Sequence, residues 1–293
     1  MDIVIALGGG GSRGFALVGV LRRLEQEGYH IQAAAGTSAG GIIAALYAAG
    51  YSPDDMEARF KELDQSKLFG RSSKDGPGLL GLSGAEKVLE NYFGQCRFED
   101  LKLPCAVVAV DLQDGREVVL SQGRVVDAIM ATIAVPGIFP PKEYQGKQLV
   151  DGAVLNPVPV SIARLLAPNL PVVAVVLDEG TSPDNVFPNI PLSIPVPAPI
   201  VKSLTRTRVA QAFGIFLKSV DVGSRKLTEM RLLEDNPEII IRPDVGGIGI
   251  LDYVNVSKTV QLGEKAAEEA LPDLKRAFTW TSRLRRKVFP KQP

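Results

Sequence analysis

A serine lies in a pattern that is typical of nucleophilic catalysis. The pentapeptide Gly36-Thr37-Ser38-Ala39-Gly40 fits G-x-S-x-G, which requires a tight turn between a strand and a helix. The apolar run Ile31–Ala35 before it predicts a strand, and Ala39–Ala49 after it predicts a helix closed by Gly50. At the N-terminus of this predicted helix, the helix dipole and free N–H groups favour developing negative charge. We therefore predict a nucleophilic serine; the alternative is a chance match in a glycine-rich chain.

A second glycine-rich turn, Gly8-Gly9-Gly10-Gly11-Ser12-Arg13-Gly14, follows the predicted strand Asp2–Leu7. It lacks the Gly-Lys-Ser/Thr ending of a phosphate-binding P-loop. Its glycine spacing fits a dinucleotide fold, but Ala34-Ala35-Gly36 stands where that fold carries an acid for the ribose. Consecutive glycines let several backbone N–H groups converge on one point. We therefore predict an oxyanion hole; the alternative is a tight turn without a ligand.

The base that would activate Ser38 cannot be a histidine of this chain. His30 is the only histidine, and it precedes the predicted second strand, whereas Ser38 follows it. A strand of about five residues spans ~17 Å, so His30 lies at the opposite edge of the sheet. The sequence thus excludes a Ser-His-Asp triad within one chain. It also excludes zinc sites of the Cys/His kind and sites that need two histidines.

A carboxylate close to Ser38 is the remaining kind of base. Its ordinary pKa of about 3.9 makes it a weak base, but partial desolvation would raise that pKa. Asp151-Gly152-Ala153 follows the short predicted strand Gln148–Val150 and is the first candidate. Asp111 and Asp178 also follow predicted strands, and the local sequence does not choose among the three.

Alternating strands and helices would position these residues. Ser52, followed by Pro53, should cap one helix, and Ser83 with Glu86 forms a capping-box pattern at the start of another, which runs to about Phe93. Three further strands and three further helices are predicted, at Cys105–Leu112, Glu117–Ser121 and Val172–Leu177, and at Phe15–Glu27, Val125–Val135 and Val158–Leu166. This alternation predicts a three-layer α/β/α fold with a mainly parallel central sheet.

Composition limits the partners and the compartment. The 293 residues include 33 basic and 33 acidic residues, and this balance argues against nucleic acid as a partner. Cys96 and Cys105 form neither a CxxC pair nor a disulfide framework, which favours a reducing compartment. Met1 runs directly into a strand without an export signal, and no apolar run is long enough to span a bilayer. We expect a cytoplasmic protein without a metal or cofactor; the sequence leaves homo-oligomer formation open.

Two of the three regions toward the end of the chain bear on membrane contact, the loop and the basic tail. Residues 185–201 combine prolines with apolar residues and predict a long ordered loop or lid, and a long helix is predicted at about 203–234. Residues 275–293 carry seven Lys or Arg and no acid. The loop would act as a lid or lie at the membrane interface, and the basic tail would contact anionic headgroups. Alternatively the loop packs as core or as a dimer contact, and the tail is a solvated end. Without a repeat or a flexible linker, residues 1–293 are expected to form a single domain, with a motif-bearing core at about 3–180.

Together the motifs resemble those of the patatin-like phospholipases. That family carries G-G-G-x-R/K-G, then G-x-S-x-G, then D-G-G or D-G-A, which stand here in the same order at Gly9–Gly14, Gly36–Gly40 and Asp151–Ala153. The segment Ala131–Pro141 resembles the block before the Asp motif. The resemblance extends from about residue 3 to residue 159, and Ala153 stands where many members carry glycine.

The resemblance implies a Ser–Asp dyad without histidine, with Ser38 as the nucleophile and Asp151 as its base. Backbone N–H groups around Gly10-Gly11-Ser12 would form the oxyanion hole, and Arg13 would orient the loop or meet a phosphate. The implied activity is hydrolysis of lipid acyl esters without a metal, of the phospholipase A or lysophospholipase kind. The alternatives are a carboxylesterase or thioesterase acting on small soluble esters, and a non-catalytic regulator that retains the fold.

Overall fold

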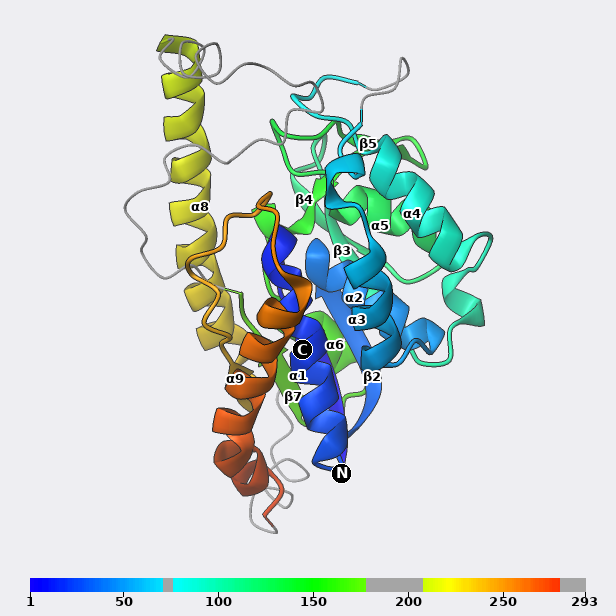
Figure 1. The fold of residues 1–293 in the computed structure, drawn as a ribbon, viewed down its shortest axis with the longest axis vertical. Helices are drawn as coiled ribbons and strands as arrows, with labels where there is room; N and C mark the ends of the chain where they lie inside the picture. Colours follow the sequence, from blue (N-terminus) through cyan, green and yellow to red (C-terminus); the bar gives the residue numbers. More distant parts are fainter. Residues whose placement is uncertain (71–75, 178–207, 280–293) are drawn as a thin grey trace.

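The computed structural model describes residues 1–70, 76–177 and 208–279 (Figure 1). The proline-rich segment 185–201, Asp178 and the part of the basic tail beyond residue 279 lie outside these ranges. The long helix predicted at about 203–234 is present as α8, which is described from Arg208 to Asp235.

A mixed, mainly parallel sheet forms the centre of the protein. Within the described residues its strand order is β5-β6-β3-β2-β1-β7-β8, and β4 pairs with β3 away from this path. The strands are β1 Asp2–Leu7, β2 His30–Thr37, β3 Cys105–Asp111, β4 Arg116–Leu120, β5 Lys142–Tyr144, β6 Lys147–Asp151, β7 Val172–Val175 and β8 Ile239–Ile241. The pairs from β3 through β2, β1 and β7 to β8 are parallel, whereas β4 and β6 run antiparallel to β3. The predicted fold class is thereby confirmed.

Helices cover both faces of this sheet. They are α1 Phe15–Gln26, α2 Ala39–Ala49, α3 Pro53–Glu62, α4 Ser83–Phe93, α5 Val125–Thr132, α6 Val160–Leu166, α8 and α9 Val256–Ala277. In β1, Ile3, Ile5 and Leu7 pack into one core with α1, α2, α5 and α9, whereas Val4 and Ala6 pack into the other core with α6. All five side chains are fully buried. A strand buried on both faces is apolar throughout, which is why β1 shows no polar alternation.

Two helices far apart in the sequence, α1 and α9, lie side by side on one face (Figure 1). A Cβ on Gly19 would lie 1.9 Å from the carbonyl oxygen of Val260, and one on Gly263 would lie 1.8 Å from that of Ala16. Neither distance is possible between real atoms, so both positions require glycine. This close crossing fixes the C-terminal helix against the helix that follows the glycine-rich turn.

The capping predictions have opposite outcomes. Ser52 forms a capping box at the start of α3, where its hydroxyl accepts the N–H of Asp55 at 3.1 Å. The capping box predicted at Ser83 is wrong, because α4 begins at Ser83 itself and this hydroxyl donates to the carbonyl of Gly70 at 2.9 Å. The side chain serves a contact with the preceding loop, so it is not available to the helix. Helix α5 ends at Thr132, three residues before the predicted end.

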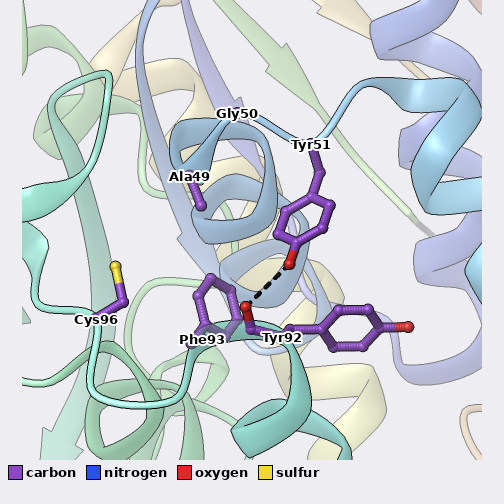
Figure 2. A pocket seen from close by; sticks show the side chains of 6 residues that line it. All are labelled: Ala49, Gly50, Tyr51, Tyr92, Phe93 and Cys96. Carbon is purple, nitrogen blue, oxygen red and sulfur yellow. Dashed lines mark hydrogen bonds between the residues drawn. The ribbon is translucent and has the colours of Figure 1, made fainter.

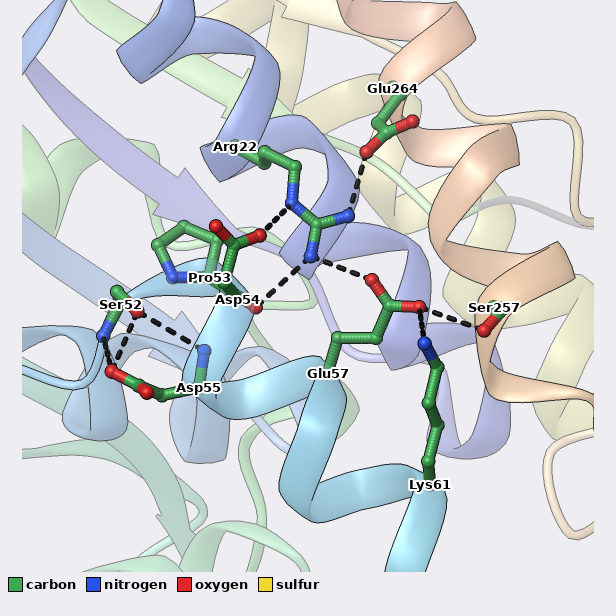
Figure 3. A network of polar contacts seen from close by, with 9 residues as sticks. All are labelled: Arg22, Ser52, Pro53, Asp54, Asp55, Glu57, Lys61, Ser257 and Glu264. Carbon is green, nitrogen blue, oxygen red and sulfur yellow. Dashed lines mark hydrogen bonds and ion pairs between the residues drawn. The ribbon is translucent and has the colours of Figure 1, made fainter.

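An ion-pair network holds α1, α3 and α9 together (Figure 3). Arg22 of α1 reaches Glu57 at 2.6 Å and Asp54 at 2.7 Å on α3, and Glu264 at 2.8 Å on α9. The side chains of Arg22 and Glu57 are only 15% and 11% exposed. Removing either partner would leave the other largely desolvated with fewer contacts to compensate its charge.

The network predicts how stability depends on pH. Burial of Glu57 opposes its ionisation, but hydrogen bonds from Lys61, Ser257 and Arg22 outweigh burial and lower its pKa to about 2. A folded-state pKa below the ordinary value of about 4.3 means that this stabilisation is present above about pH 5 and lost toward pH 2. We expect Glu57→Gln to reduce the free energy of unfolding by about 2 kcal/mol at pH 7 and by less as the pH falls.

Urea denaturation of wild type and Glu57→Gln between pH 7 and pH 3 would measure this difference. Glu62→Gln, which changes an exposed carboxylate on the same helix, is the matched control and should cost little. If the loss in free energy of unfolding caused by Glu57→Gln stays constant over this pH range, the role assigned to the carboxylate is contradicted.

Candidate active site

Ser38 lies on a strained turn between β2 and α2. Its backbone has φ 54° and ψ −125°, an unfavourable region for a residue with a Cβ, and its side chain is buried. A Cβ on Gly36 would lie 2.3 Å from the carbonyl oxygen of Gly40, and one on Gly40 would lie 2.2 Å from that of Leu7. The two glycines of the motif are therefore required by close approach of the backbone, and the predicted strand-turn-helix context is present.

Asp151 lies level with Ser38 across a single strand. Thr37, the last residue of β2, is the register partner of Val108 in β3, and Asp151, the last residue of β6, is the partner of Ala109. Because β6 runs antiparallel to β3, its end returns toward the serine turn. The arrangement brings the nucleophile and the carboxylate predicted as its base to neighbouring positions.

The carboxylate of Asp151 is buried and hydrogen-bonded. It accepts a hydrogen bond from the Ser38 hydroxyl, and its Oδ1 accepts the N–H of Ala153 at 2.8 Å. Burial raises the pKa of Asp151 to about 6, although both hydrogen bonds act in the opposite direction. A carboxylate with this pKa is a stronger base than an exposed aspartate, yet it is ionised near pH 7.

Of the other carboxylates that follow strands, Asp111 is engaged elsewhere. Its carboxylate accepts hydrogen bonds at 3.0 Å from the N–H of Gln113 and from the Lys147 ammonium, and these contacts lower its pKa. An aspartate stabilised in its ionised form is a poor base. Asp178 lies outside the described residues.

His30 lies at the far end of the strand that leads to Ser38. It is the first residue of the eight-residue strand β2, and its side chain is 70% exposed beside Asp2. Eight residues of strand span about 26 Å, so the imidazole cannot contact the serine hydroxyl. The prediction that His30 stands at the opposite edge of the sheet is confirmed.

The glycine-rich turn lies directly against the serine. A Cβ on Gly9 would lie 3.1 Å from the Cβ of Ser38 and 3.8 Å from that of Ala153, so this position faces both other motifs. Gly14 ends the short 3-10 helix Gly11–Gly14 and packs against Ala39, the first residue of α2. The three motifs, separated in the sequence, thus meet at one place.

The hydrogen bonds of this turn narrow the set of possible oxyanion donors. The N–H groups of Gly9 and Ser12 donate to the carbonyls of Pro157 and Ile250, at 3.1 and 3.0 Å. Ser12 is therefore not available as an oxyanion donor, contrary to what the resemblance implied. The N–H groups of Gly10-Gly11 make no hydrogen bond to another described residue. These two remain as candidate donors.

Arg13 ties the turn to the C-terminal part of the fold. Its side chain is 4% exposed, and its Nε donates to the carbonyl of Ile248 at 2.6 Å. Its Nη1 donates to the carbonyl of Leu177 at 3.5 Å, and its backbone N–H donates to that of Gly10 at 3.2 Å. These contacts favour the loop-orienting role of Arg13 over contact with a phosphate.

The Asp motif requires a glycine after the carboxylate. A Cβ on Gly152 would lie 2.3 Å from the carbonyl oxygen of Val108, so only glycine fits where the chain crosses β3. The next residue, Ala153, has space for its methyl group beside Gly9. This explains why the D-G-A form is compatible with the site.

Two buried polar residues beside the motifs have no role assigned from the sequence. Thr132 accepts the N–H of Ser38 on its hydroxyl at 2.9 Å, and the carbonyl of Asn156 accepts the Thr37 hydroxyl at 2.8 Å. Thr132 and Asn156 are fully buried. The sequence signal that could have indicated such a residue is a polar side chain in an otherwise apolar run. Thr132 shows this signal, whereas Asn156, which precedes a proline, does not.

A pocket of about 290 Å³ lies away from these motifs (Figure 2). Its lining residues come from the end of α2 and the end of α4; they are Ala49, Gly50, Tyr51, Tyr92, Phe93 and Cys96. Ser38 precedes the other end of α2, and the 11 residues of this helix span about 16 Å. The pocket therefore does not belong to the serine site.

The described parts of the chain hold neither a group of metal-binding side chains nor a membrane-spanning helix. Across residues 1–70, 76–177 and 208–279, no three His, Cys, Asp or Glu side chains are grouped closely enough to hold a metal ion. Within the same ranges, every helix is too short or too polar to cross a bilayer.

Comparison with known proteins assigns the motifs to one family. Residues 5–164 match the model of the family described as patatin-like phospholipase, and the chain belongs to this family. An NTE family protein of Mycobacterium bovis is 36% identical over 162 residues, which cover 54% of this chain and 44% of that protein. A second NTE family protein of that organism is 29% identical over 280 residues, which cover 93% of this chain and 47% of that protein.

More distant proteins extend the comparison. Lysophospholipase NTE1 of Saccharomyces cerevisiae is 30% identical over 172 residues, which cover 55% of this chain and 10% of that protein. The crystal structure of VipD from Legionella pneumophila matches with a TM-score of 0.56 at 12% identity, over 92% of this chain and 66% of that one. This likeness concerns the fold. The chain spans about half the length of its mycobacterial relatives.

The buried carboxylate predicts a cost in stability. Because the pKa of Asp151 in the folded protein is raised to about 6, the folded state loses stability as the pH rises through this value. Asp151→Asn removes the charge and keeps the acceptor for Ala153. We expect it to raise the free energy of unfolding by on the order of 2 kcal/mol above pH 7, and by little near pH 4.

Denaturant titrations of wild type and variant from pH 4 to pH 8 would measure this gain. Asp111→Asn is the matched control with the opposite sign, because the lowered pKa of Asp111 means that its ionised form stabilises the protein at neutral pH. Equal effects of the two substitutions, or an Asp151→Asn gain that does not grow with pH, would refute a desolvated Asp151.

Proposed function

We propose that this protein is a serine acyl hydrolase of the phospholipase A or lysophospholipase kind, acting on lipid acyl esters. The observation that carries the proposal is the placement of the strained Ser38 beside the buried Asp151 carboxylate, which is hydrogen-bonded to its hydroxyl. Next to them lies a turn in which the N–H groups of Gly10 and Gly11 make no hydrogen bond to another described residue. Membership of the patatin-like phospholipase family supports it.

The proposed reaction has two steps. Ser38 Oγ attacks the acyl carbonyl carbon while Asp151 takes the hydroxyl proton, and the N–H groups of Gly10 and Gly11 stabilise the oxyanion. The proton passes to the leaving alcohol as the tetrahedral intermediate collapses to an acyl-enzyme. Water then attacks the acyl-enzyme and Asp151 takes its proton. As the second tetrahedral intermediate collapses and the fatty acid leaves, Asp151 returns this proton to Ser38 Oγ.

The proposed substrate is a lipid because of the family and because a matched relative is named a lysophospholipase. Such a substrate requires peripheral contact with a membrane or micelle, and we assign that contact to the segment 185–201 and the basic residues after Lys275. We further propose that the described elements belong to a single domain acting in the cytoplasm. The packing of α9 on α1 and of β8 on β7 supports a single domain.

The dyad predicts a defined pH dependence. Because Asp151 must be ionised to accept a proton, kcat/KM on p-nitrophenyl acyl esters should rise with pH to a plateau, with a midpoint near its pKa of about 6. Asp151→Asn should reduce kcat by about 10²- to 10⁴-fold, and Ser38→Ala should abolish labelling by a fluorophosphonate probe.

Asp111→Asn, on the neighbouring strand, is the control that should keep near-normal activity. Full activity of Asp151→Asn, or probe labelling that persists in Ser38→Ala, would overturn the dyad. A folded wild type that neither hydrolyses esters nor takes up the probe would favour a non-catalytic regulator instead.

The substrate class is decided by a separate measurement. A panel of lysophospholipid micelles, phospholipid vesicles, short p-nitrophenyl esters and acyl thioesters should show the highest kcat/KM on the long-chain lipids, with Ser38→Ala as the blank. Preference for short esters or thioesters would instead indicate a soluble carboxylesterase or thioesterase.

A further inference from the structure

The backbone of Ser38 is held by a side chain from another part of the sequence. Because Ser38 directly precedes α2, its N–H has no acceptor within that helix. Thr132, the last residue of α5, accepts this N–H on Oγ1 at 2.9 Å and donates its own hydroxyl proton to the carbonyl of Val108. Ser38 is 7% exposed and Thr132 is fully buried. One hydroxyl thus satisfies a buried donor and a buried acceptor.

This hydroxyl lies where two strands of the sheet separate. Thr37 and Val108 are the last register pair of β2 and β3, and the chain leaves the sheet at Ser38 with a positive φ. The Thr132 hydroxyl connects the N–H of Ser38, the residue after Thr37, to the carbonyl of Val108. A strained backbone conformation persists only where its surroundings hold it in place, and Thr132 supplies such a contact.

The same segment also holds the base. Two residues after Thr132, the carbonyl of Ala134 accepts the backbone N–H of Asp151 at 3.0 Å. Ala134 is fully buried. A single turn of chain therefore contacts the backbones of both Ser38 and Asp151, on either side of β3. The relative placement of nucleophile and base depends on the position of this turn.

We propose that Thr132 is a positioning residue for Ser38. The Thr132 hydroxyl holds the strained turn so that Ser38 Oγ faces the Asp151 carboxylate. The inference rests on the proposed function, since the orientation of Ser38 matters only if it attacks a substrate. Thr132 acts through the backbone N–H of Ser38 and contacts no reacting atom. The position requires a group that both accepts and donates a hydrogen bond.

Two substitutions separate the hydroxyl from the rest of the side chain. Thr132→Val replaces the hydroxyl by a methyl group of similar size and leaves the Ser38 N–H without its acceptor, whereas Thr132→Ser keeps the hydroxyl. We expect Thr132→Val to lower kcat on p-nitrophenyl esters by about 10- to 100-fold with KM changed less than about threefold. Thr132→Ser should stay within about threefold of wild type.

A matched control tests whether loss of any buried threonine hydroxyl has this effect. Thr259 is 2% exposed, and its hydroxyl donates to the Asn255 carbonyl within one turn of α9. Thr259→Val should reduce the melting temperature without lowering kcat. If Thr132→Val does not fold, Thr132→Ala removes the same hydroxyl without adding a methyl group and takes its place.

Two further readouts respond to positioning and not to stability alone. A displaced Ser38 hydroxyl no longer donates to Asp151, and because this hydrogen bond lowers the Asp151 pKa, its loss should move the acidic limb of the kcat/KM profile to higher pH. Hydrogen exchange of the Ser38 amide, followed by NMR, should be about tenfold or more faster in Thr132→Val than in Thr132→Ser.

The outcomes distinguish this proposal from the proposed function. The proposal is supported if Thr132→Val lowers kcat while Thr132→Ser and Thr259→Val keep a kcat close to that of wild type. An active Thr132→Val enzyme within about twofold of wild type, or an equal loss in Thr132→Ser, overturns it while Ser38→Ala still reports on the dyad. If wild type is inactive, the proposed function fails. If the Ser38 amide exchanges equally fast in Thr132→Val and Thr132→Ser, Thr132 does not hold the Ser38 turn, and the positioning proposal fails as well.

Discussion

The site depends on a carboxylate held in the protein interior beside a serine. The Asp151 carboxylate has no ion-pair partner among the described residues; it accepts hydrogen bonds from the Ser38 hydroxyl and the Ala153 N–H. Burial without a cation raises its pKa, and this is what makes an aspartate useful as a base near neutral pH. An adjacent arginine or lysine would stabilise the ionised form and make the carboxylate a weaker base. The site is thus built around a charge that remains costly for the folded protein.

The sheet makes this arrangement possible by reversing one strand. In a purely parallel sheet the residues after each strand collect at the same edge, and β2 follows that rule with the serine turn. The antiparallel β6 approaches from the other side of β3, so that its last residue, Asp151, is level with the end of β2. Glycines allow the crossings: Gly152 passes over a carbonyl of β3, and Gly40 passes over one of β1. The backbone is consequently close-packed beside both motifs.

Sequence reasoning succeeded where the signal was local. The apolar strand β1, the glycine turn and the strand-turn-helix around Ser38 follow from residue types within short windows, as does the capping of α3 by Ser52. It failed where side chains or backbone found partners far away in the chain. Ser83 bonds to a loop instead of capping its own helix, and Ser12 donates its N–H to Ile250 and is lost as an oxyanion donor. The strands β5 and β8, three residues each, are too short to show a period.

By itself, the sequence determined that Ser38, if it is a nucleophile, must use a carboxylate as its base. One histidine and the length of one strand were sufficient, because strand length is fixed by backbone geometry. It could not select among Asp151, Asp111 and Asp178, since their local contexts are alike. The tertiary structure distinguished Asp151 from Asp111 by bringing Asp151 to Ser38 without a cation beside it, whereas the Lys147 ammonium binds the Asp111 carboxylate. Desolvation and hydrogen bonding across strands depend on residues far apart in the sequence, such as Ser38 and Asp151, and only the folded chain brings these together.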